Sequence, residues 1–333
     1  MLRVGIVGCG GIAAAHMQGY SQLQDKAKIT AVCDVDAAKA ASAAERFGPA
    51  RTYTDVQDLM ADSEVDAVSI CLPHHLHAPA ILAAATAGKH VLCEKPLCTT
   101  REEAIAVREA VRASGITLMC AHNQLFEPAI DHAREVISSG ALGDIYMAST
   151  ADCFTVHNSA EQWGWRRNLA TAGGGELLDT GYHPTYTLLY LMSLAGLAPI
   201  EVAAMQGRYR QMMLEGEDTA HVLVRFNGGA IGQILTSWSF ELPEGTHSFH
   251  VIGEKGQLYG RRNVSTFQPN GGESQTVTRE PVVSYHRQLP HFIDAVEARR
   301  RPIQNEDDGV AVLEVILSAY DSDAQKRIVP FAV

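Results

Sequence analysis

The 333-residue sequence contains no long hydrophobic run, because its apolar stretches are short and broken by polar residues. A helix that crosses a bilayer needs about 20 consecutive apolar residues, so a membrane-spanning protein is excluded. The start also lacks the charged, apolar and small-residue regions of a secretory signal, since Met1-Leu2-Arg3 leads directly into a strand-like pattern. We therefore expect a cytoplasmic protein that has no membrane partner.

Paired cysteines are absent as well. The seven cysteines are an odd number, and none of them forms a CxxC pair. This spacing supports neither a disulfide framework nor a zinc site. We expect small, buried thiols in a reducing compartment and no bound metal.

The sequence has fewer basic than acidic residues. The 27 lysines and arginines are outnumbered by 38 acidic residues, which gives a formal net charge of −11. An acidic surface repels phosphate backbones, so a nucleic-acid partner is excluded. The one dense basic run, Arg299-Arg300-Arg301 before Pro302, is typical of the end of a helix.

The length favours two domains, and the pattern changes near residue 121. Residues 1–121 alternate between short apolar runs and Ala-rich stretches, a pattern that builds a parallel sheet with helices on both faces. The expected strands are Leu2–Val7, Ile29–Asp34, Asp66–Leu72, His90–Cys93 and Ile116–Cys120, and the expected helices are Ile12–Leu23, Ala37–Phe47, Leu76–Ala87 and Thr100–Ala113.

Residues 122–333 are richer in strands and predict an α+β domain with a mostly antiparallel sheet. We expect strands at Asp144–Val156, Ile200–Arg210, Thr219–Phe226, Ala230–Phe240, His247–Gly253 and Gln257–Arg261, and helices at Ile130–Ser138, Asp179–Leu194, His286–Arg300 and Asp307–Gln325. The strand at 230–240 is apolar on both faces, with Ile231 and Leu235 opposite Ile234 and Trp238. Helices can cover one face, and a second subunit could cover the other.

Gly8-Cys9-Gly10-Gly11-Ile12-Ala13 follows the first strand and opens a helix. This GxGxxA pattern is a form of the dinucleotide-binding motif, in which the glycines allow a tight turn and a close approach of pyrophosphate. The free N–H groups at the start of the helix then favour the anion. The context of strand, turn and helix predicts a nucleotide site.

Asp34 ends the second strand, 26 positions after Gly8, where an acidic residue can bind the ribose hydroxyls. A carboxylate there would repel a 2′-phosphate, and Val35 follows in place of an arginine that could hold one. The sequence therefore favours NAD over NADP.

Glu94-Lys95-Pro96 directly follows the strand His90–Cys93. Ligands of parallel α/β sheets bind beyond the carboxyl ends of the strands, so Lys95 could hold a substrate oxygen near the nicotinamide. A surface ion pair between Lys95 and Glu94 explains the position equally well. The strand before it, Asp66–Leu72, is followed by Pro73-His74-His75-Leu76-His77. We expect one or two of these histidines to line the cofactor site.

Asp179 and His183 are four residues apart, so on one helix they would share a face. A carboxylate beside an imidazole can fix its tautomer and stabilise its protonated form. The alternative is a helix-capping aspartate and a partly buried histidine. The preceding Gly173-Gly174-Gly175 indicates a flexible or closely packed approach to this helix.

In combination these elements resemble the Gfo/Idh/MocA oxidoreductases, the family of glucose–fructose oxidoreductase and inositol dehydrogenase. The matching segments are GIVGCGGIA at residues 5–13, Asp34, Leu72-Pro73 with His77, Glu94-Lys95-Pro96, and Asp179 with His183. They follow one another in the family's order over nearly the whole chain.

The resemblance implies a Rossmann domain followed by an open-faced sheet domain that forms homodimers or homotetramers. It implies a small polyhydroxylated substrate, a catalytic set of Lys95, Asp179 and His183, and NAD as the hydride acceptor. Cofactor contacts are expected from Gly8, Gly10, Gly11, Ile12, Asp34, Val35, Leu72, Pro73, His77, Glu94, Lys95 and Asn123. Substrate contacts are expected from Lys95, Asn123, His157, Arg166, Asp179, Thr180 and His183.

Three functions therefore stay open at this stage. The first is an NAD-dependent dehydrogenase in which His183 takes the substrate proton and Lys95 stabilises the oxyanion. The second is an enzyme that retains NAD and uses transient oxidation for isomerisation or glycoside cleavage. The third is a non-catalytic NAD and sugar sensor, against which the presence of both Lys95 and His183 counts.

Overall fold

The computed structural model describes residues 1–49 and 51–332. It divides into two compact units: unit 1 comprises Met1–Asn123 with Val283–Val310, and unit 2 comprises Gln124–Val282 with the chain from Ala311 onward. The boundary expected between residues 121 and 122 thus differs for Val283–Val310, which follows the second domain in sequence but belongs to unit 1. Its helix α11 (Ser284–Glu297) packs on helix α1 (Gly11–Ser21), where Gly19 leaves room for Leu289.

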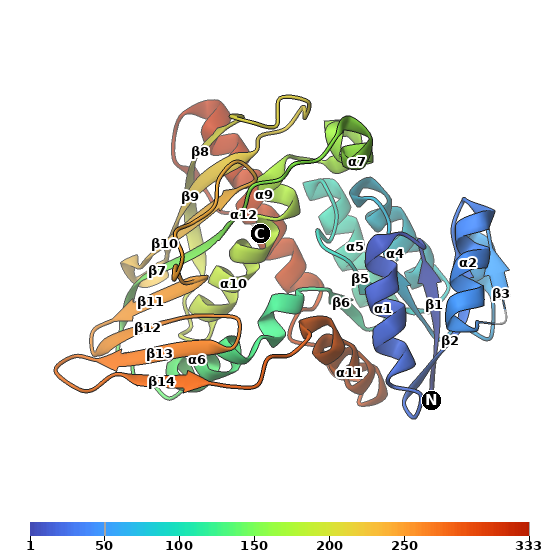
Figure 1. Ribbon diagram of the computed structural model, residues 1–333, viewed down its shortest axis with the longest axis horizontal. Coiled ribbons are helices and arrows are strands. Elements are labelled where there is room, and N and C mark those ends of the chain that lie inside the picture. Colours follow the sequence, from blue (N-terminus) through green and yellow to red (C-terminus); the bar gives the residue numbers. More distant parts are fainter. Residues whose placement is uncertain (50, 333) are drawn as a thin grey trace. The chain divides into compact units, whose positions relative to one another are not determined.

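Unit 1 is built on a six-stranded parallel sheet with the strand order β3-β2-β1-β4-β5-β6. This is the order of the dinucleotide-binding fold, and Figure 1 shows helices on both faces of the blue and teal sheet. Its remaining elements are β1 (Leu2–Val7), β2 (Ala27–Cys33), α2 (Ala37–Phe47), β3 (Arg51–Tyr53), α3 (Val56–Ala61), β4 (Ala67–Ile70), α4 (His77–Thr86), β5 (His90–Cys93), α5 (Arg101–Ser114) and β6 (Leu118–Cys120).

Local signals explain where these helices begin and end. Helix α5 starts with a capping box, in which the Thr100 side chain accepts the Glu103 N–H and the Glu103 side chain reaches back to the backbone N–H of Thr100. It stops at Gly115, whose positive φ of 68° suits glycine. Asp36 caps α2 in the same way by accepting from the N–H groups of Ala38 and Lys39. These helices therefore carry their own boundaries in sequence.

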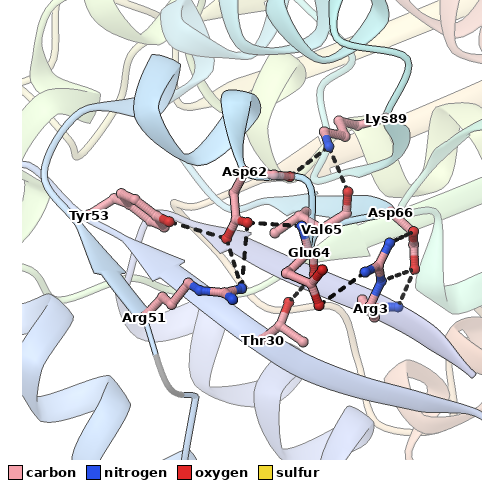
Figure 2. A network of polar contacts seen from close by, with 9 residues as sticks. All are labelled: Arg3, Thr30, Arg51, Tyr53, Asp62, Glu64, Val65, Asp66 and Lys89. Carbon is pink, nitrogen blue, oxygen red and sulfur yellow. Dashed lines mark hydrogen bonds and ion pairs between the residues drawn. The ribbon is translucent and has the colours of Figure 1, made fainter.

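A polar network ties together the ends of the sheet opposite to the glycine-rich turn (Figure 2). Arg3 binds both oxygens of Asp66 and also pairs with Glu64. The ammonium of Lys89 is buried and donates to the carbonyls of Asp62 and Val65, at 2.8 and 2.7 Å. Each buried donor thus has acceptors, as burial requires. The network holds the amino-terminal ends of β1, β4 and β5 and leaves the carboxyl ends to the ligand.

Unit 2 contains a nine-stranded sheet with the order β14-β13-β12-β11-β7-β10-β9-β8-β15, antiparallel except for the pair β7 and β10. The strands are β7 (Ile145–Cys153), β8 (Pro199–Gly207), β9 (Thr219–Phe226), β10 (Ile231–Ser237), β11 (Phe249–Gly253), β12 (Gly256–Arg261), β13 (Val264–Pro269), β14 (Gln275–Thr278) and β15 (Val329–Pro330). Its helices are α6 (Pro128–Ser138), α7 (Ala160–Trp163), α8 (Leu169–Ala172), α9 (Glu176–Asp179), α10 (Tyr182–Ser193) and most of α12 (Glu306–Gln325).

One face of this sheet is covered by helices and the other is open within the unit. Helices α6 and α10 pack on the covered face, as the orange and green ribbons of Figure 1 show. Strand β9 alternates accordingly, with Val222 and Val224 fully buried and Leu223 45% exposed. On the open face, Ile231 pairs with Met147 and both side chains are exposed. Strand β10 therefore carries apolar side chains on both faces, with Ile231 on the open face and Ile234 on the covered face.

The helix predicted over Asp179–Leu194 is not one helix. It consists of the short α9, which ends at Asp179, and of α10, which begins at Tyr182. Between them the N–H of Gly181 bonds to the carbonyl of Glu176, and the N–H of His183 bonds to that of Thr180. The regular spacing that would place Asp179 and His183 on one helical face is interrupted there, so their partners must be read from the structure.

Among the helices that the structure describes, none combines the length and apolar character needed to span a bilayer.

Candidate active site

The glycine-rich turn of unit 1 is shaped by backbone contacts. Gly8 has φ +89°, and a Cβ built on it would lie 2.4 Å from the carbonyl oxygen of Cys71, so only glycine fits. At Gly10 and Gly11, by contrast, a built Cβ would meet no described atom within 4 Å. Gly10 precedes α1 without any side-chain cap, so no capping side chain occupies the first N–H groups of α1. This arrangement fits a pyrophosphate.

Asp34 is fixed against this turn. One carboxylate oxygen accepts the N–H of Cys9 at 2.8 Å, and the other accepts the N–H of Asp36 at 2.9 Å. A carboxylate offers about four acceptor positions, so capacity for ribose hydroxyls is left. The neighbouring Val35 is 88% exposed. Asp34 thus orders the glycine-rich turn.

His77 has a different position from the one expected. It is completely buried, with Nδ1 2.6 Å from the carbonyl oxygen of Pro96 and Nε2 2.8 Å from that of Leu72. Burial lowers its pKa, although both carbonyls favour the protonated ring. Both ring nitrogens contact backbone carbonyls, so His77 ties together the segments after β4 and β5. Pro73 is half-buried in the first of these segments.

Glu94 is not a surface residue paired with Lys95. It is 7% exposed, and its Oε1 lies 2.8 Å from Nε2 of the buried His16 on α1. Burial opposes protonation of this ring, but Cys71 and Glu94 outweigh it and raise the pKa of His16 to about 10. The surface-pair alternative is therefore wrong. Glu94 anchors the segment that carries the half-buried Lys95.

Asn123 follows His122, whose ring is affected by the charge of Lys95. Burial and the positive Lys95 lower the pKa of the neighbouring His122 to about 3. The amide nitrogen of Asn123 donates to the hydroxyl of Ser284 at 2.8 Å, while its buried Oδ1 has no hydrogen-bond partner in the described part of the chain. A hydroxyl or an amide N–H group of a ligand could donate a hydrogen bond to this oxygen.

In unit 2, Asp179 forms a close ion pair. Its Oδ2 lies 2.5 Å from Nε of Arg166, and the carboxylate is nearly buried. The guanidinium of Arg166 also stacks 4.3 Å from the centre of the Trp165 ring. The sequence analysis expected both Asp179 and Arg166 at the substrate, but it did not foresee that they bind each other.

His183 is held by a tyrosine. Its Nδ1 lies 2.7 Å from the hydroxyl oxygen of Tyr186, one helical turn along α10, and the two rings meet edge to face. That oxygen also accepts the backbone N–H of Gln124 at 3.1 Å. Tyr186 is 1% exposed. Tyr186 was not among the residues predicted for the site, and the one sequence signal for it is the i, i+3 spacing from His183.

Thr180 belongs to an aromatic cluster. Its hydroxyl accepts the indole N–H of Trp238 at 2.8 Å, and the ring centres of Trp238 and Trp163 are 4.8 Å apart. Val156 packs on the same cluster, and the next residue, His157, lies exposed in the loop after β7. Trp238 was noted in the sequence only as an apolar strand residue, and nothing in the spacing linked it to Thr180.

The glycine run before α9 serves close packing. A Cβ on Gly175 would lie 2.2 Å from the carbonyl oxygen of Glu217. Glu217 Oε1 accepts the N–H of Leu177 at 2.8 Å and the hydroxyl of Tyr320 at 3.1 Å, and burial raises the pKa of Glu217 to about 7. Burial also raises the pKa of the adjacent Glu176 well above its ordinary value. The base of α9 is thus closely packed and contains two buried carboxyl groups, Glu176 and Glu217, whose pKa values are raised.

Within residues 1–49 and 51–332, no three or more His, Cys, Asp or Glu side chains are grouped so that they could hold a metal ion.

Unit 1 therefore combines an anion-binding turn, an acidic residue after the second strand and a lysine beyond the carboxyl end of β5. Unit 2 combines a histidine, an ion-paired aspartate and an aromatic cluster. Together they define a nicotinamide-nucleotide-dependent oxidoreductase with a Rossmann domain.

The comparisons with known proteins give the family. Residues 2–122 match the model described as "Oxidoreductase family, NAD-binding Rossmann fold", and residues 130–259 match the "GFO/IDH/MocA C-terminal domain". The chain belongs to the Gfo/Idh/MocA family, as its motifs suggested.

Relatives of similar length support this assignment. The chain is 31% identical to 1,5-anhydro-D-fructose reductase of Ensifer adhaerens, over 97% of both proteins. It is 26% identical to D-glucoside 3-dehydrogenase of Escherichia coli K12, over 96% of this chain and 95% of that protein. Levoglucosan dehydrogenase in complex with NADH and levoglucosan has the same fold, with a TM-score of 0.90, 23% identity and full coverage of both chains.

Proposed function

We propose that this protein is an NAD-dependent dehydrogenase that transfers hydride between nicotinamide and a hydroxyl-bearing carbon of a sugar, cyclitol or related polyol. The observation that carries the proposal is the position of His183, whose ring is directed by a contact of 2.7 Å between its Nδ1 and the hydroxyl oxygen of Tyr186. The sugar-directed names of the relatives support the substrate class. The glycine turn and Asp34 support the cofactor.

We assign the chemical step to Lys95, Asp179 and His183. Bound NAD would supply the hydride acceptor, held by the glycine turn and Asp34. Nε2 of His183 takes the proton of the substrate hydroxyl as general base. The ammonium of Lys95 stabilises the oxygen as it becomes negative. Asp179, neutralised in part by Arg166, offsets the positive charge on the imidazole. Asn123, Arg166, Thr180 and His157 are the proposed substrate contacts.

A screen tests this function. The purified protein would be incubated with NAD and with polyols, cyclitols, aldoses and glycosides, one at a time, while the near-ultraviolet absorbance of NADH is followed. Accumulation of NADH with one of these classes is the expected result. Conversion of the sugar without free NADH would instead establish the cofactor-retaining isomerase or glycoside-cleaving reaction. Binding of both ligands with neither change would establish a sensor.

We also propose that NAD is preferred over NADP. A carboxylate at Asp34 would lie where the 2′-phosphate must go, and the next residue, Val35, is an exposed valine that cannot bind phosphate. The proposal concerns this chain and not the whole family, because a 30% identical relative from Haloferax volcanii is named D-xylose 1-dehydrogenase (NADP(+)) 2.

The open face of the unit 2 sheet supports a further proposal, a homodimer or homotetramer joined through this sheet. Met147, Met205, Leu223 and Ile231 are all at least 38% exposed there. Leu235→Glu, which adds a charge to β10 on the same face as Ile231, should reduce the mass measured by light scattering. Ile105→Glu, an equally apolar exposed position on α5, should leave the mass unchanged. A monomeric wild type at micromolar concentration would contradict the proposal.

A cytoplasmic location is proposed as well. None of the seven cysteines, all of which lie in the described residues, forms a disulfide bond, and a reducing compartment keeps thiols in this state. Cell fractionation with an antibody to the native protein would test it.

A further inference from the structure

Unit 1 contains a cavity of about 640 Å³ at the amino-terminal ends of β5 and β6, where helices α4, α5 and α11 end. All of its lining residues belong to unit 1, among them His90 and Leu118 at the starts of the two strands. Its volume is typical of small-molecule sites, which span roughly 300–1,000 Å³. The glycine-rich turn follows the carboxyl end of β1 in the same parallel sheet, so the cavity is separate from the candidate cofactor site.

Basic side chains dominate the wall of this cavity. Among the described residues, Arg112 and Arg299-Arg300-Arg301 line it together with one carboxylate, Glu306, which gives an excess of three positive charges. The chain as a whole has a net charge of −11. His90 adds no charge, because burial lowers the pKa of its ring. The cavity is therefore a local positive site on an acidic protein, and such a site attracts anions.

Two of the four arginines are held by acidic side chains. Arg301 bonds to Glu306 at 2.7 Å and to Asp307 at 2.6 Å, and Arg112 bonds to Asp307 at 2.8 Å. Asp307 thus bridges two guanidinium groups and fixes their positions. When its charge is counted as well, an excess of two positive charges is left at the cavity.

The other two arginines are not engaged in this way. Within residues 1–49 and 51–332, the side chains of Arg299 and Arg300 have no hydrogen-bond or ion-pair partner. A basic residue after a helix commonly offsets the partial negative charge of the last carbonyls. Here backbone groups already satisfy these carbonyls, since the N–H of Arg299 bonds to that of Val296 and the N–H of Arg300 to that of Ala295. The end of α11 therefore does not require these two guanidinium groups.

Arg299 also has a backbone conformation that favours glycine. Its φ is 54° less than half a turn from none of the regular structures but lies at +49°, in the left-handed region. The two other helix ends at the cavity have Gly88 and Gly115 in this region, with φ of 67° and 68°. A glycine at position 299 would end α11 equally well. The arginine side chain thus supplies something that the helix end does not need.

We propose that this cavity binds the phosphate group of a small anionic molecule. The planar guanidinium fork binds phosphate oxygens in pairs. A phosphate monoester carries about 1.5 to 2 negative charges, which matches the excess of two positive charges. Val111, Ile116 and Val296 form an apolar part of the wall that can contact the rest of the molecule. The proposal does not depend on the reaction assigned to His183.

The test measures binding of phenyl phosphate to the full-length protein by calorimetry, with NAD present to occupy the glycine-rich turn. Phenyl phosphate has no aliphatic hydroxyl group, so it cannot be oxidised at the candidate active site. We expect one binding site per chain and an affinity that falls with added salt. Arg299→Gly and Arg300→Gln should each weaken binding about tenfold, the scale of a lost hydrogen bond to a charged group.

Arg108→Gln is the matched control for Arg300→Gln. Arg108 lies one turn before Arg112 on α5 and is outside the described lining of the cavity, so its replacement removes the same charge away from the site. This variant should bind phenyl phosphate as the wild type does. Melting temperatures without ligand show that each variant is folded, and glycine suits the φ of position 299.

Competition identifies the anion. Inorganic phosphate should displace phenyl phosphate, and succinate, a dicarboxylate, should do so more weakly. Tighter binding of phenyl phosphate than of inorganic phosphate indicates that the natural ligand is an ester, whereas equal binding indicates free phosphate, and both results support a phosphate site. The proposal is overturned if neither phosphate compound binds, if succinate competes as well as phosphate, or if Arg299→Gly and Arg300→Gln bind no more weakly than Arg108→Gln.

Discussion

The nucleotide side of the candidate site and its chemical side were foreseen to very different degrees. In unit 1 the turn, the start of α1 and Asp34 lie as the motif predicts, because the contacts are made by backbone atoms close in sequence. In unit 2 the predicted residues contact side chains to which the sequence pattern had not linked them. Asp179 binds Arg166, and His183 binds Tyr186. Backbone motifs can thus be read from spacing, whereas side-chain pairing requires the fold.

The largest expected effect is a loss of turnover that leaves NAD binding intact. Lys95→Ala and His183→Ala should each lower kcat by roughly 10²-fold or more, the usual scale for a lost acid–base or charged group at the reacting atoms. NAD binding by calorimetry should stay nearly unchanged in His183→Ala, because the anion-binding turn is intact. Lys28→Ala, which removes an exposed lysine from β2, serves as the control. Normal turnover by His183→Ala would show that the base has been assigned incorrectly.

The second prediction concerns the nucleotide side alone. Wild-type protein should bind NAD at least about tenfold more tightly than NADP, and Asp34→Ser should narrow this ratio because it removes the repulsion of the 2′-phosphate. The variant should also bind NAD more weakly, since the N–H of Cys9 loses its charged acceptor. Calorimetry with both nucleotides measures the ratio.

The control for this ratio lies two residues away. Asp36→Ser removes the same charge, but serine still caps α2, so the preference for NAD should persist. Equal binding of NAD and NADP by the wild type would remove the basis of the prediction.

The third prediction tests whether the chemical side works through pairs. Asp179→Asn should lower kcat by about tenfold, less than the loss of His183, because the imidazole remains in place. Arg166→Gln should also impair turnover, and the double variant should cost less than the sum of both changes, since contacting residues couple by about 0.5–3 kcal/mol. Arg167→Gln, an exposed neighbour, should be neutral. Additive effects would mean that the ion pair is incidental to catalysis.

The same division explains what could be predicted of the fold. The ranges of β1, α2, β5 and β9 agree with the sequence analysis, because each is bounded by a cap, a turn or a clear change of periodicity. Strand β3 was not predicted, since Arg51–Tyr53 is a three-residue edge strand with little apolar character. The break at Thr180-Gly181 and the return of Val283–Val310 to unit 1 follow from packing that no local pattern records.

The smallest expected effect contrasts one carboxyl group from each unit. Burial raises the pKa of Glu217 to about 7, whereas in the unfolded chain this group ionises near 4.5. Between these values the unfolded chain has released the proton and the folded chain retains it, so stability falls as the pH rises. In unit 1 the opposite holds for Asp66. Its hydrogen bonds to Arg3 lower its pKa, so its contribution is already complete above the ordinary value of 3.8 and is lost only in more acidic solution.

Glu217→Gln should therefore raise the melting temperature at about pH 8 by roughly 2–4 °C and change it little at about pH 5. The amide oxygen can still accept from Leu177 and Tyr320, so the packing of α9 is kept. Asp66→Asn should instead lower the melting temperature by the same amount at both pH values, because the group that it replaces is ionised throughout this range. A pH-independent effect of Glu217→Gln would mean that burial does not raise the pKa of Glu217, and the packed base of α9 would then be negatively charged already near pH 5.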